Sequence, residues 1–238
     1  RHAEELVNLA DQKGCVLAVD HTFLYTGAVK KIAEIVHSGE LGSVVYIDSV
    51  RINLGLFQHD VNVIWDLAPH DLSIITHLFD RSAVSAQAVG IRYGSNRLES
   101  VAYTHLEYDN EAVAHCHFNW VSPVKIRRVL ITGTEKMIVY DDMEQNEKVK
   151  VFDKGIVLVE GDRDSYDSIR VGYRTGDIVA PNIPVREALE VEAEHFLECV
   201  RTRAKPLSDG QFGLNVVRQL EACQQSLDNG GTKVRIPS

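Results

Sequence analysis

The chain has 238 residues, of which 45% are hydrophobic and 25% charged, a balance typical of a globular protein with a buried core. Its formal net charge of -9 argues against a surface for nucleic acid or anionic membranes, because such surfaces need clustered lysine and arginine. No window approaches the run of about 18 apolar residues that a membrane span needs. We therefore expect a soluble protein that binds neither nucleic acid nor membranes, although a local basic pocket for an anionic small molecule fits the charge.

The four cysteines lie far apart and form no C-x-x-C pair: Cys15, Cys116, Cys199 and Cys223. They fall in segments with the pattern of core strands or helices. We expect buried free thiols and a reducing compartment, the cytoplasm.

The first 21 residues have the pattern of a helix followed by a strand. Residues 1–13 carry apolar residues at helical spacing, Gly14 supplies a stop, and CVLAVDH (residues 15–21) has the composition of a short buried strand. One helix and one strand would leave the apolar strand faces uncovered, so this unit is typical of the closing step of a larger α/β sheet. We place a domain boundary there, between residues 1–21 and residues 22–238.

The next segment predicts a helix, a strand and a second helix. Thr26 can cap a helix over about residues 27–37, and SGELG ends it. SVVYIDSVRINLG then predicts a strand, and LFQHDVNV a loop. The second helix is expected from about Leu67 or Pro69 to Phe79, with Pro69 in the first turn, where its missing N–H costs nothing.

From about residue 83 to residue 152 the hydrophobic period shifts towards two, with turn signals at YDNEA and GTEK. This pattern predicts an antiparallel sheet of roughly five to seven strands, with one apolar face and one mixed face that is available to a ligand or another subunit. Residues 155–184 are the least regular, and EGDRDSYDS and PNIP indicate exposed loop. Helices over 185–203 and 212–227 and a short strand, TKVRI, follow. The fold class is thus α/β, with an α+β domain built on a large open, mostly antiparallel sheet that has helices on one face.

Asp66 and His70, in WDLAPHD, are the first candidates for chemistry. Side chains at i and i+4 of a helix lie on one face, about 5 to 6 Å apart. His70 can take up a proton near neutral pH while Asp66 holds its tautomer. The spacing also fits two metal ligands, or Asp66 as the helix N-cap beside a packed core histidine, and by itself it favours the cap. Asp71 points to another face, where we expect it to make a structural bond.

Further candidates are histidines with metal-ligand spacing and a group of basic and polar residues. His115 and His117 share one face of a strand but have no third ligand nearby in sequence, and His59 and Asp60 can join Asp66 and His70 as the metal site of a hydrolase. A basic cluster suits a phosphate or carboxylate of a substrate, or is a charged edge strand. Its members and neighbours are Tyr25, Arg51, Asn53, Lys125, Arg127 and Arg128.

Motifs for nucleotide phosphates are absent from this sequence. No two glycines stand two residues apart, so G-x-G-x-x-G cannot be written, and G-x-x-x-x-G-K-[ST] is not found either. The chain as given carries no dinucleotide fingerprint.

Four stretches in this order nevertheless resemble the Gfo/Idh/MocA family of NAD(P)-dependent oxidoreductases: VLAVDHTFLYTGAVKKIAEIVHSGELGSVVYI, RINLG, WDLAPHDLSIITHLF and FLECVRTRAKPLSDGQFGLNVVRQLEACQQSL. That family joins a Rossmann domain to a C-terminal α/β domain with a large open sheet. The resemblance implies that residues 1–21 are the last helix and strand of the Rossmann domain and that residues 22–238 bind substrate and form oligomers. The family's glycine fingerprint and its E-K-P lysine would lie before Arg1. We therefore expect this chain alone to bind NAD or NADP weakly and to be inactive.

The resemblance also assigns roles to residues. The family's D-x-x-x-H motif falls on Asp66 and His70, which implies that His70 is the acid/base for the substrate hydroxyl and that Asp66 orients it or binds substrate. His21 and Tyr25 fall where the family contacts nicotinamide or substrate, although Leu24 stands where many members have arginine. Arg51, Asn53, Lys125 and Arg127 are the candidates for substrate binding.

The implied activity is oxidation of a secondary alcohol of a sugar, cyclitol or nucleotide sugar, with NAD or NADP as cofactor. HTFLY and LAPHD resemble members that oxidise nucleotide sugars such as UDP-N-acetylglucosamine. The alternative is a non-catalytic substrate-binding or oligomerisation module, in which Asp66 is a cap and His70 a packed histidine. In either case the family implies a homodimer or homotetramer, formed through the mixed face of AHCHFNW and IRRVLITG.

Overall fold

The computed structural model describes residues 1–160 and 169–237 and is built on a mixed sheet of nine strands. The strand order is β10-β7-β6-β5-β1-β4-β3-β2-β11, and neighbours are antiparallel except the parallel pair β1 and β4. The strands are β1 (Val44–Leu54), β2 (Ser85–Ile91), β3 (Val101–Glu107), β4 (Val113–Asn119), β5 (Val121–Gly133), β6 (Met137–Asp141), β7 (Val149–Phe152), β10 (Ile178–Val179) and β11 (Val234–Arg235). The mostly antiparallel open sheet predicted from the sequence is therefore confirmed, and six of its strands lie between residues 83 and 152.

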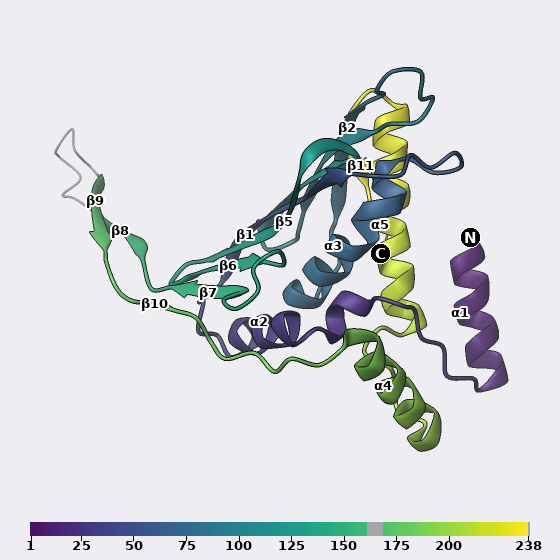
Figure 1. Cartoon of the computed structure of the whole chain (residues 1–238), viewed down its shortest axis with the longest axis horizontal. Helices are drawn as coiled ribbons and strands as arrows, with labels where there is room; N and C mark the ends of the chain where they lie inside the picture. Colours follow the sequence, from purple (N-terminus) through teal and green to yellow (C-terminus); the bar gives the residue numbers. More distant parts are fainter. Residues whose placement is uncertain (161–168, 238) are drawn as a thin grey trace.

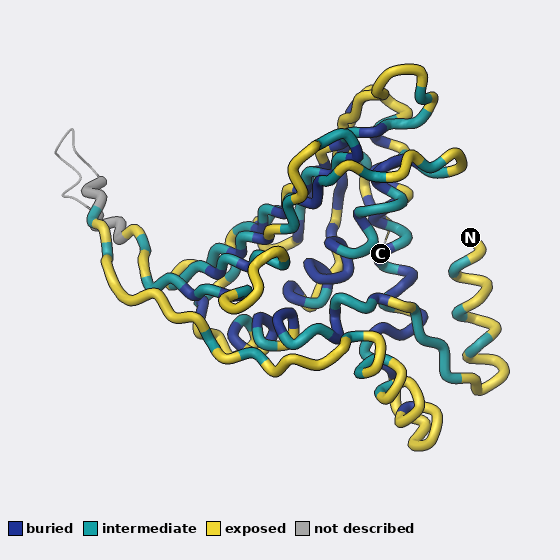
Figure 2. The backbone as a smooth tube through the Cα atoms, in the orientation of Figure 1, coloured by how far each residue is buried: buried dark blue, intermediate teal, exposed yellow. Residues whose placement is uncertain are grey.

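Helices lie on one face of this sheet and leave the other face open (Figure 1). They are α2 (Gly27–His37), α3 (Val63–Phe79) and α5 (Gly210–Asp228), while α1 (His2–Lys13) lies beside α5 and α4 (Ala188–Thr202) beside the short 3₁₀ helix η1 (Thr22–Tyr25). Figure 2 shows buried residues concentrated where these helices meet the sheet. No helix in the described ranges is both long and apolar enough to cross a membrane.

The alternation of β1 decides which side chains enter the core. Ile47, Ser49 and Arg51 are buried, whereas Asp48 and Val50 between them are only half-buried. Because side chains alternate along a strand, one set faces the helices and the other faces the open side. Two polar side chains, Ser49 and Arg51, thus point into the core next to α3.

The start of α3 differs from the prediction. The helix begins at Val63, where Asn62 is the N-cap and its Oδ1 accepts hydrogen bonds from the N–H groups of Ile64 and Trp65. Pro69 therefore lies inside the helix rather than in its first turn. Buried apolar side chains on both sides of Pro69 hold the helix together there, which offsets the lost backbone hydrogen bond.

Two other predictions of secondary structure are wrong. The segment CVLAVDH is not a strand, because its only ladder contact is a single bridge between Ala18 and Asp209, and no other strand in the described part of the chain pairs with it. Within residues 155–184, expected to be irregular, a hairpin forms from β8 (Gly155–Glu160) and β9 (Ile169–Arg174). The segment IVLVE is typical of such a strand, but the turn signals in the residues that follow it favoured a loop. Most of EGDRDSYDS lies outside the described residues.

The local signals for caps and turns are confirmed elsewhere. Thr26 accepts a hydrogen bond from the N–H of Val29 at the start of α2, and Gly14 ends α1 with a positive φ of 61°. The turns at YDNEA and GTEK join β3 to β4 and β5 to β6. Short-range signals thus located most elements correctly.

The Asn62 cap generates a testable prediction for stability. Asn62 is buried, and its amide also donates to Oε1 of Gln224 on α5, at 2.9 Å. Asn62→Ala should lower the free energy of unfolding by about 1 to 2 kcal/mol, because two helix N–H groups lose their acceptor. Urea unfolding of the chain measures this loss. Asn62→Ser keeps a capping oxygen and should lose less; equal losses in the two variants would contradict the assigned cap.

Candidate functional site

His70 lies on α3 at the side of the sheet that carries Arg51. Its ring packs edge-on against Phe23 of η1, with ring centroids 5.2 Å apart and planes at 61°. His70 is half-buried, and its ring nitrogens have no hydrogen-bond partner among the described residues. The imidazole is thus held by packing, while its nitrogens are free to meet a ligand.

A buried ion pair lies beside His70. Arg51 donates through Nε and Nη2 to the carboxylate of Asp71, and Ser49 Oγ donates to the same carboxylate at 2.7 Å. Arg51 is 5% exposed and Asp71 2% exposed. The Arg51 guanidinium also stacks over Phe23, with Cζ 4.5 Å from the ring centroid. The structural bond expected for Asp71 is confirmed, whereas Arg51, predicted to bind substrate, lies beneath the surface.

These charges and the burial of His70 act together on its protonation. Burial lowers the pKa of His70 most, and the guanidinium of Arg51 lowers it next; the smaller effects are those of Asp71, which raises it, Arg127, which lowers it, and Asp66, which raises it. The imidazole is therefore neutral at neutral pH. A neutral imidazole with free nitrogens can accept a proton from a hydroxyl group.

Asp66 does not cap the helix. Its Oδ2 accepts a hydrogen bond of 2.8 Å from the indole Nε1 of Trp120. Trp120 is fully buried, and its ring lies so close to Gly55 that a Cβ at this position would be 2.6 Å from Trp120 Cδ1. Glycine at position 55 therefore allows the indole to reach Asp66.

Phe23 and Trp120 are site residues that the sequence reasoning missed. Both are aromatic and carry no titratable group, and Trp120 is 54 residues from its partner Asp66. The only local signal for Phe23 was its place in HTFLY, two residues from His21.

The predicted basic residues lie on two different faces of the sheet, because side chains alternate along a strand. Arg127 of β5 is the register partner of Arg51, and it shares the helix-side face with Lys125. Arg127 is half-buried and lies 3.5 Å from Asp142, whereas Lys125 is exposed. Arg128 points to the open face and pairs with Asp141. Asn53, half-buried on β1, follows Arg51 on the helix side. Lys125, Arg127 and Asn53 thus share the sheet face of Arg51, and Arg128 does not.

His21 and Tyr25 are both buried, His21 just before η1 and Tyr25 at its end. Burial and the nearby His70 lower the pKa of His21 to about 4, and its Nε2 has no hydrogen-bond partner among the described residues. The hydroxyl of Tyr25 lies 3.1 Å from Ser208 Oγ, and its ring packs near His195 of α4. The predicted contact of Tyr25 with substrate or cofactor stays a prediction, and the structure shows its hydroxyl already bonded within the protein.

The remaining histidine candidates do not form a metal cluster with each other. His115 and His117 point to the open face, where His115 Nδ1 lies 3.3 Å from Asp48 and His117 stacks on Tyr103 at 4.3 Å between centroids. In residues 1–160 and 169–237, no group of three His, Cys, Asp or Glu side chains is arranged to hold a metal ion. The grouping of His59 and Asp60 with Asp66 and His70 therefore gains no support.

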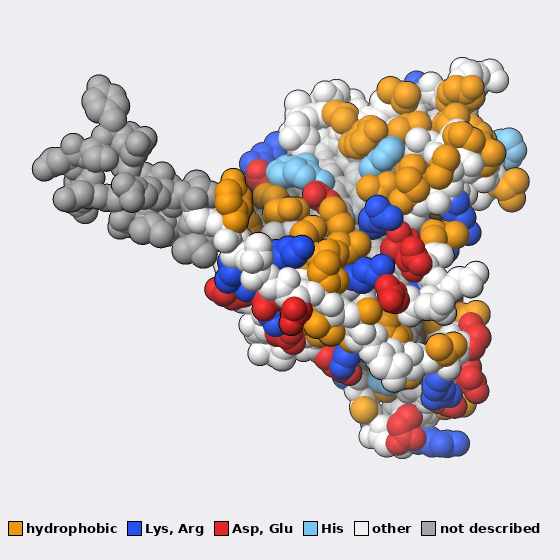
Figure 3. Space-filling view, turned by 60° about the vertical axis from the view of Figure 1, so that its left-hand side comes forward, with side chains coloured by type: hydrophobic (Ala, Val, Ile, Leu, Met, Phe, Trp, Pro, Cys, Tyr) orange, Lys and Arg blue, Asp and Glu red, His pale blue; other side chains and the backbone are white. Residues whose placement is uncertain are grey.

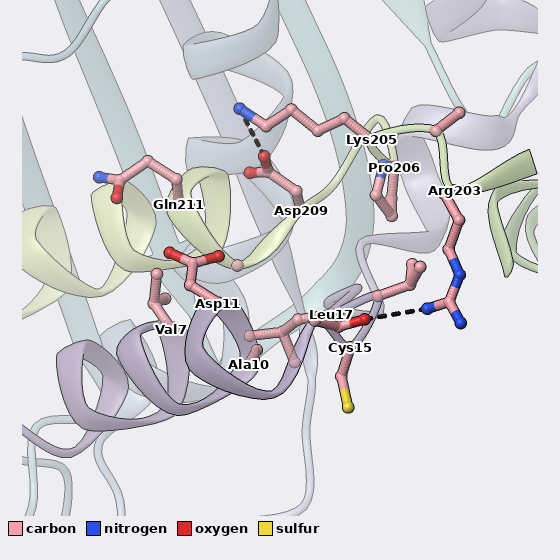
Figure 4. A pocket seen from close by; sticks show the side chains of 14 residues that line it. Val7, Ala10, Asp11, Cys15, Leu17, Arg203, Lys205, Pro206, Asp209 and Gln211 are labelled. Atoms are coloured by element: carbon pink, nitrogen blue, oxygen red, sulfur yellow. Dashed lines mark hydrogen bonds and ion pairs between the residues drawn. The ribbon is translucent and has the colours of Figure 1, made fainter.

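A separate cavity of about 410 Å³ lies between the end of α1 and the start of α5 (Figure 4). Three of its charged side chains are engaged within the protein: Lys205 pairs with Asp209 at 2.6 Å, and Arg203 donates to the carbonyl oxygen of Gly14. None of the predicted site residues lines it. The site around His70 therefore remains the candidate.

The depressed pKa of His21 generates a prediction for the pH dependence of stability. The unfolded chain binds the proton near pH 6.5 and the folded chain only near pH 4, so this residue destabilises the fold progressively as pH falls through that window. The full effect is roughly 3 kcal/mol. His21→Gln should flatten the dependence of unfolding free energy on pH between 6.5 and 4, measured by urea unfolding. His2→Gln, in the exposed part of α1, is the matched control; equal slopes in both variants would refute the assignment.

Comparison with known proteins finds similar sequences and structures. Residues 29–139 match the family model described as GFO/IDH/MocA C-terminal domain. A UDP-N-acetylglucosamine 3-dehydrogenase from Acidithiobacillus ferrooxidans is 24% identical over 218 residues, which are 90% of this chain and 63% of that protein. The chain thus spans less than two thirds of the length of this curated relative.

Solved structures share the fold over nearly the whole chain. The UDP-N-acetylglucosamine 3-dehydrogenase from Acidithiobacillus ferrooxidans superposes with a TM-score of 0.76 and 21% identity, covering 96% of this chain and 67% of that one. An inositol dehydrogenase homologue from Azotobacter vinelandii, complexed with NADH and myo-inositol, gives a TM-score of 0.75 and 17% identity, covering 98% and 68%. Residues 29–139 are thus similar to the C-terminal domain of GFO/IDH/MocA proteins, and the chain shares the fold of these solved structures.

Proposed function

We propose that the chain supplies the substrate-binding part of an NAD(P)-dependent dehydrogenase that oxidises a secondary alcohol of a sugar, cyclitol or nucleotide sugar. The observation that carries this proposal is His70, a neutral imidazole with free nitrogens, held beside a buried cation on the domain that matches the family. His70 accepts the proton of the substrate hydroxyl. Asp66, fixed by Trp120, presents its other carboxylate oxygen to a hydroxyl group of the substrate.

The cofactor implied by the family fits this chain only in part. The sequence contains no glycine fingerprint for a pyrophosphate, so the described residues offer at most a contact to the nicotinamide end. The buried, unpartnered Nε2 of His21 is the polar atom suited to such a contact. A nicotinamide bound there would supply the hydride acceptor for the carbinol carbon, and the residues of this chain would hold the substrate and accept its proton. We assign residues 1–21 to the cofactor domain and residues 22–238 to the substrate domain.

A nucleotide sugar, such as UDP-N-acetylglucosamine oxidised at C3, is the finer proposal for the substrate. It is supported by the relative from Acidithiobacillus ferrooxidans and by the cationic side chains of Lys125 and Arg127 on the site face, which suit a diphosphate. Asn53 is a further candidate for the sugar. The proposed location is the cytoplasm, since the four cysteines, Cys15, Cys116, Cys199 and Cys223, are free. The last three are buried as expected, whereas Cys15 is exposed, so the expectation of a buried thiol is wrong there.

The role of His70 is tested in the longer protein that includes the cofactor domain. His70→Ala should lower turnover by about 10²- to 10⁴-fold, because the substrate hydroxyl loses its proton acceptor. Steady-state kinetics with UDP-N-acetylglucosamine or myo-inositol and NAD or NADP measure the loss. His37→Ala, an exposed histidine at the end of α2, should leave turnover unchanged. Full activity of His70→Ala would refute His70 as the proton acceptor, whereas no turnover in the unchanged protein would point to a module that binds without catalysing.

We also propose that the open sheet face joins copies of this chain into a dimer or tetramer. It carries a hollow of about 550 Å³ lined by Val89, Tyr103 and His117 among others, and Tyr103 is 52% exposed. Figure 3 shows histidine side chains among hydrophobic ones on the side that faces the viewer. Such an exposed apolar area is typical of an interface.

The oligomer is tested by sedimentation of the chain at several concentrations. We expect a dimer or tetramer, and Tyr103→Glu should dissociate it, because a charge would be buried without a partner. Tyr173→Glu, an exposed tyrosine of β9 outside this sheet, is the control. A monomer at all concentrations would refute this assembly.

A further inference from the structure

Side chains from three elements meet behind His70 and form one stacked group. Phe23 of η1 contacts the His70 ring on α3 and carries the Arg51 guanidinium of β1 over its face, at 4.5 Å. Asp71 holds that guanidinium through two of its nitrogens, and Ser49 holds Asp71. The cation therefore has one fixed position relative to the imidazole.

The burial of Arg51 strengthens the effect of its charge on the nearby His70. Arg51 and Asp71 are almost fully removed from solvent, and charges in such a place are weakly screened by water and salt. Two nitrogens of the Arg51 guanidinium bond Asp71, and Phe23 covers one face of the group. Its position suits an action on His70 rather than on substrate.

We propose that Arg51 is a positioning residue, which Asp71 and Phe23 hold in place so that it keeps the His70 imidazole neutral and oriented to accept a proton. This inference rests on the function proposed above. The charged or titratable groups around His70 are Arg51 of β1, Arg127 of β5, Asp66 and Asp71 of α3, and His21 before η1. Among the charges, Arg51 lowers the pKa of His70 most.

The test is NMR titration of the His70 imidazole in this 238-residue chain, with His70→Gln identifying its signals. Arg51→Met should raise the pKa of His70, and Asp71→Asn should lower it, because each variant removes a charge of opposite sign. Arg51→Lys keeps the cation and should leave the pKa near that of the unchanged chain. An unmoved His70 titration in folded Arg51→Met would overturn the proposal.

Two further variants show whether the His70 titration responds to the charge of Arg51 in particular or to the loss of any arginine. Arg128→Met removes the same charge from β5 but on the open face, where Arg128 pairs with Asp141, so it should leave the His70 titration unchanged. Arg51→Met strands the buried carboxylate of Asp71 and can fail to fold. The double variant Arg51→Met/Asp71→Asn removes both charges; the pKa of His70 should still rise, because Arg51 has the larger effect, and no rise would overturn the proposal.

Kinetics of the longer protein distinguish this inference from the proposed function. In Arg51→Met, the acid limb of the pH profile of kcat/KM should move to higher pH together with the NMR titration, while in Arg128→Met it should stay in place. A limb that stays while the NMR titration moves would overturn the part given to His70 in the reaction. An NMR titration that stays would overturn the role of Arg51, whatever the activity.

Discussion

The buried ion pair between Arg51 and Asp71 is the interaction on which the arrangement of the site depends. Two charges removed from water cost more free energy than their attraction returns unless their geometry is good, so such a pair is weak evidence for stability. Its geometry is specific, because Arg51 uses two nitrogens and Ser49 satisfies the same carboxylate. The pair fixes α3 against β1 in one register, and through Phe23 it also fixes η1. The pair thus fixes the surroundings of His70 and keeps the charged Arg51 guanidinium near it.

The parity of β1 and β5 separates two surfaces of one sheet. One set of alternating side chains, which includes Arg51 and Arg127, faces the helices and His70. The other set, which includes Arg128, faces the open side. A shift of one residue in the register would exchange the two sets. β1 is the central strand of the nine, and it pairs with β5 on one side and β4 on the other, so its register is fixed from both sides. The site and the proposed interface are therefore specified together.

The sequence predicted what depends on short-range signals and missed what depends on distant partners. Thr26, Gly14 and the two turns were recognisable because the cap or turn involves residues only a few positions apart. Asn62 carried an equally local signal, but the nearby Asp66 and Pro69 offered a competing start for α3. The pairing of Arg51 with Asp71, 20 residues away, and of Asp66 with Trp120, 54 residues away, required the fold itself. CVLAVDH shows the converse: strand composition without a neighbouring strand gives no strand.

Asp66 and His70 show how far spacing alone carries an argument. The i and i+4 positions place both on one side of α3, yet the structure gives them different partners, the Trp120 indole for Asp66 and the Phe23 ring for His70. Asp66 contributes only the weakest of the charge effects on His70, and it opposes the dominant one. An aspartate that oriented the imidazole would hydrogen-bond it and raise its pKa, whereas burial and Arg51 lower that pKa. The His70 ring is therefore held by packing against Phe23, and Asp66 bonds Trp120 through one carboxylate oxygen only among the described residues.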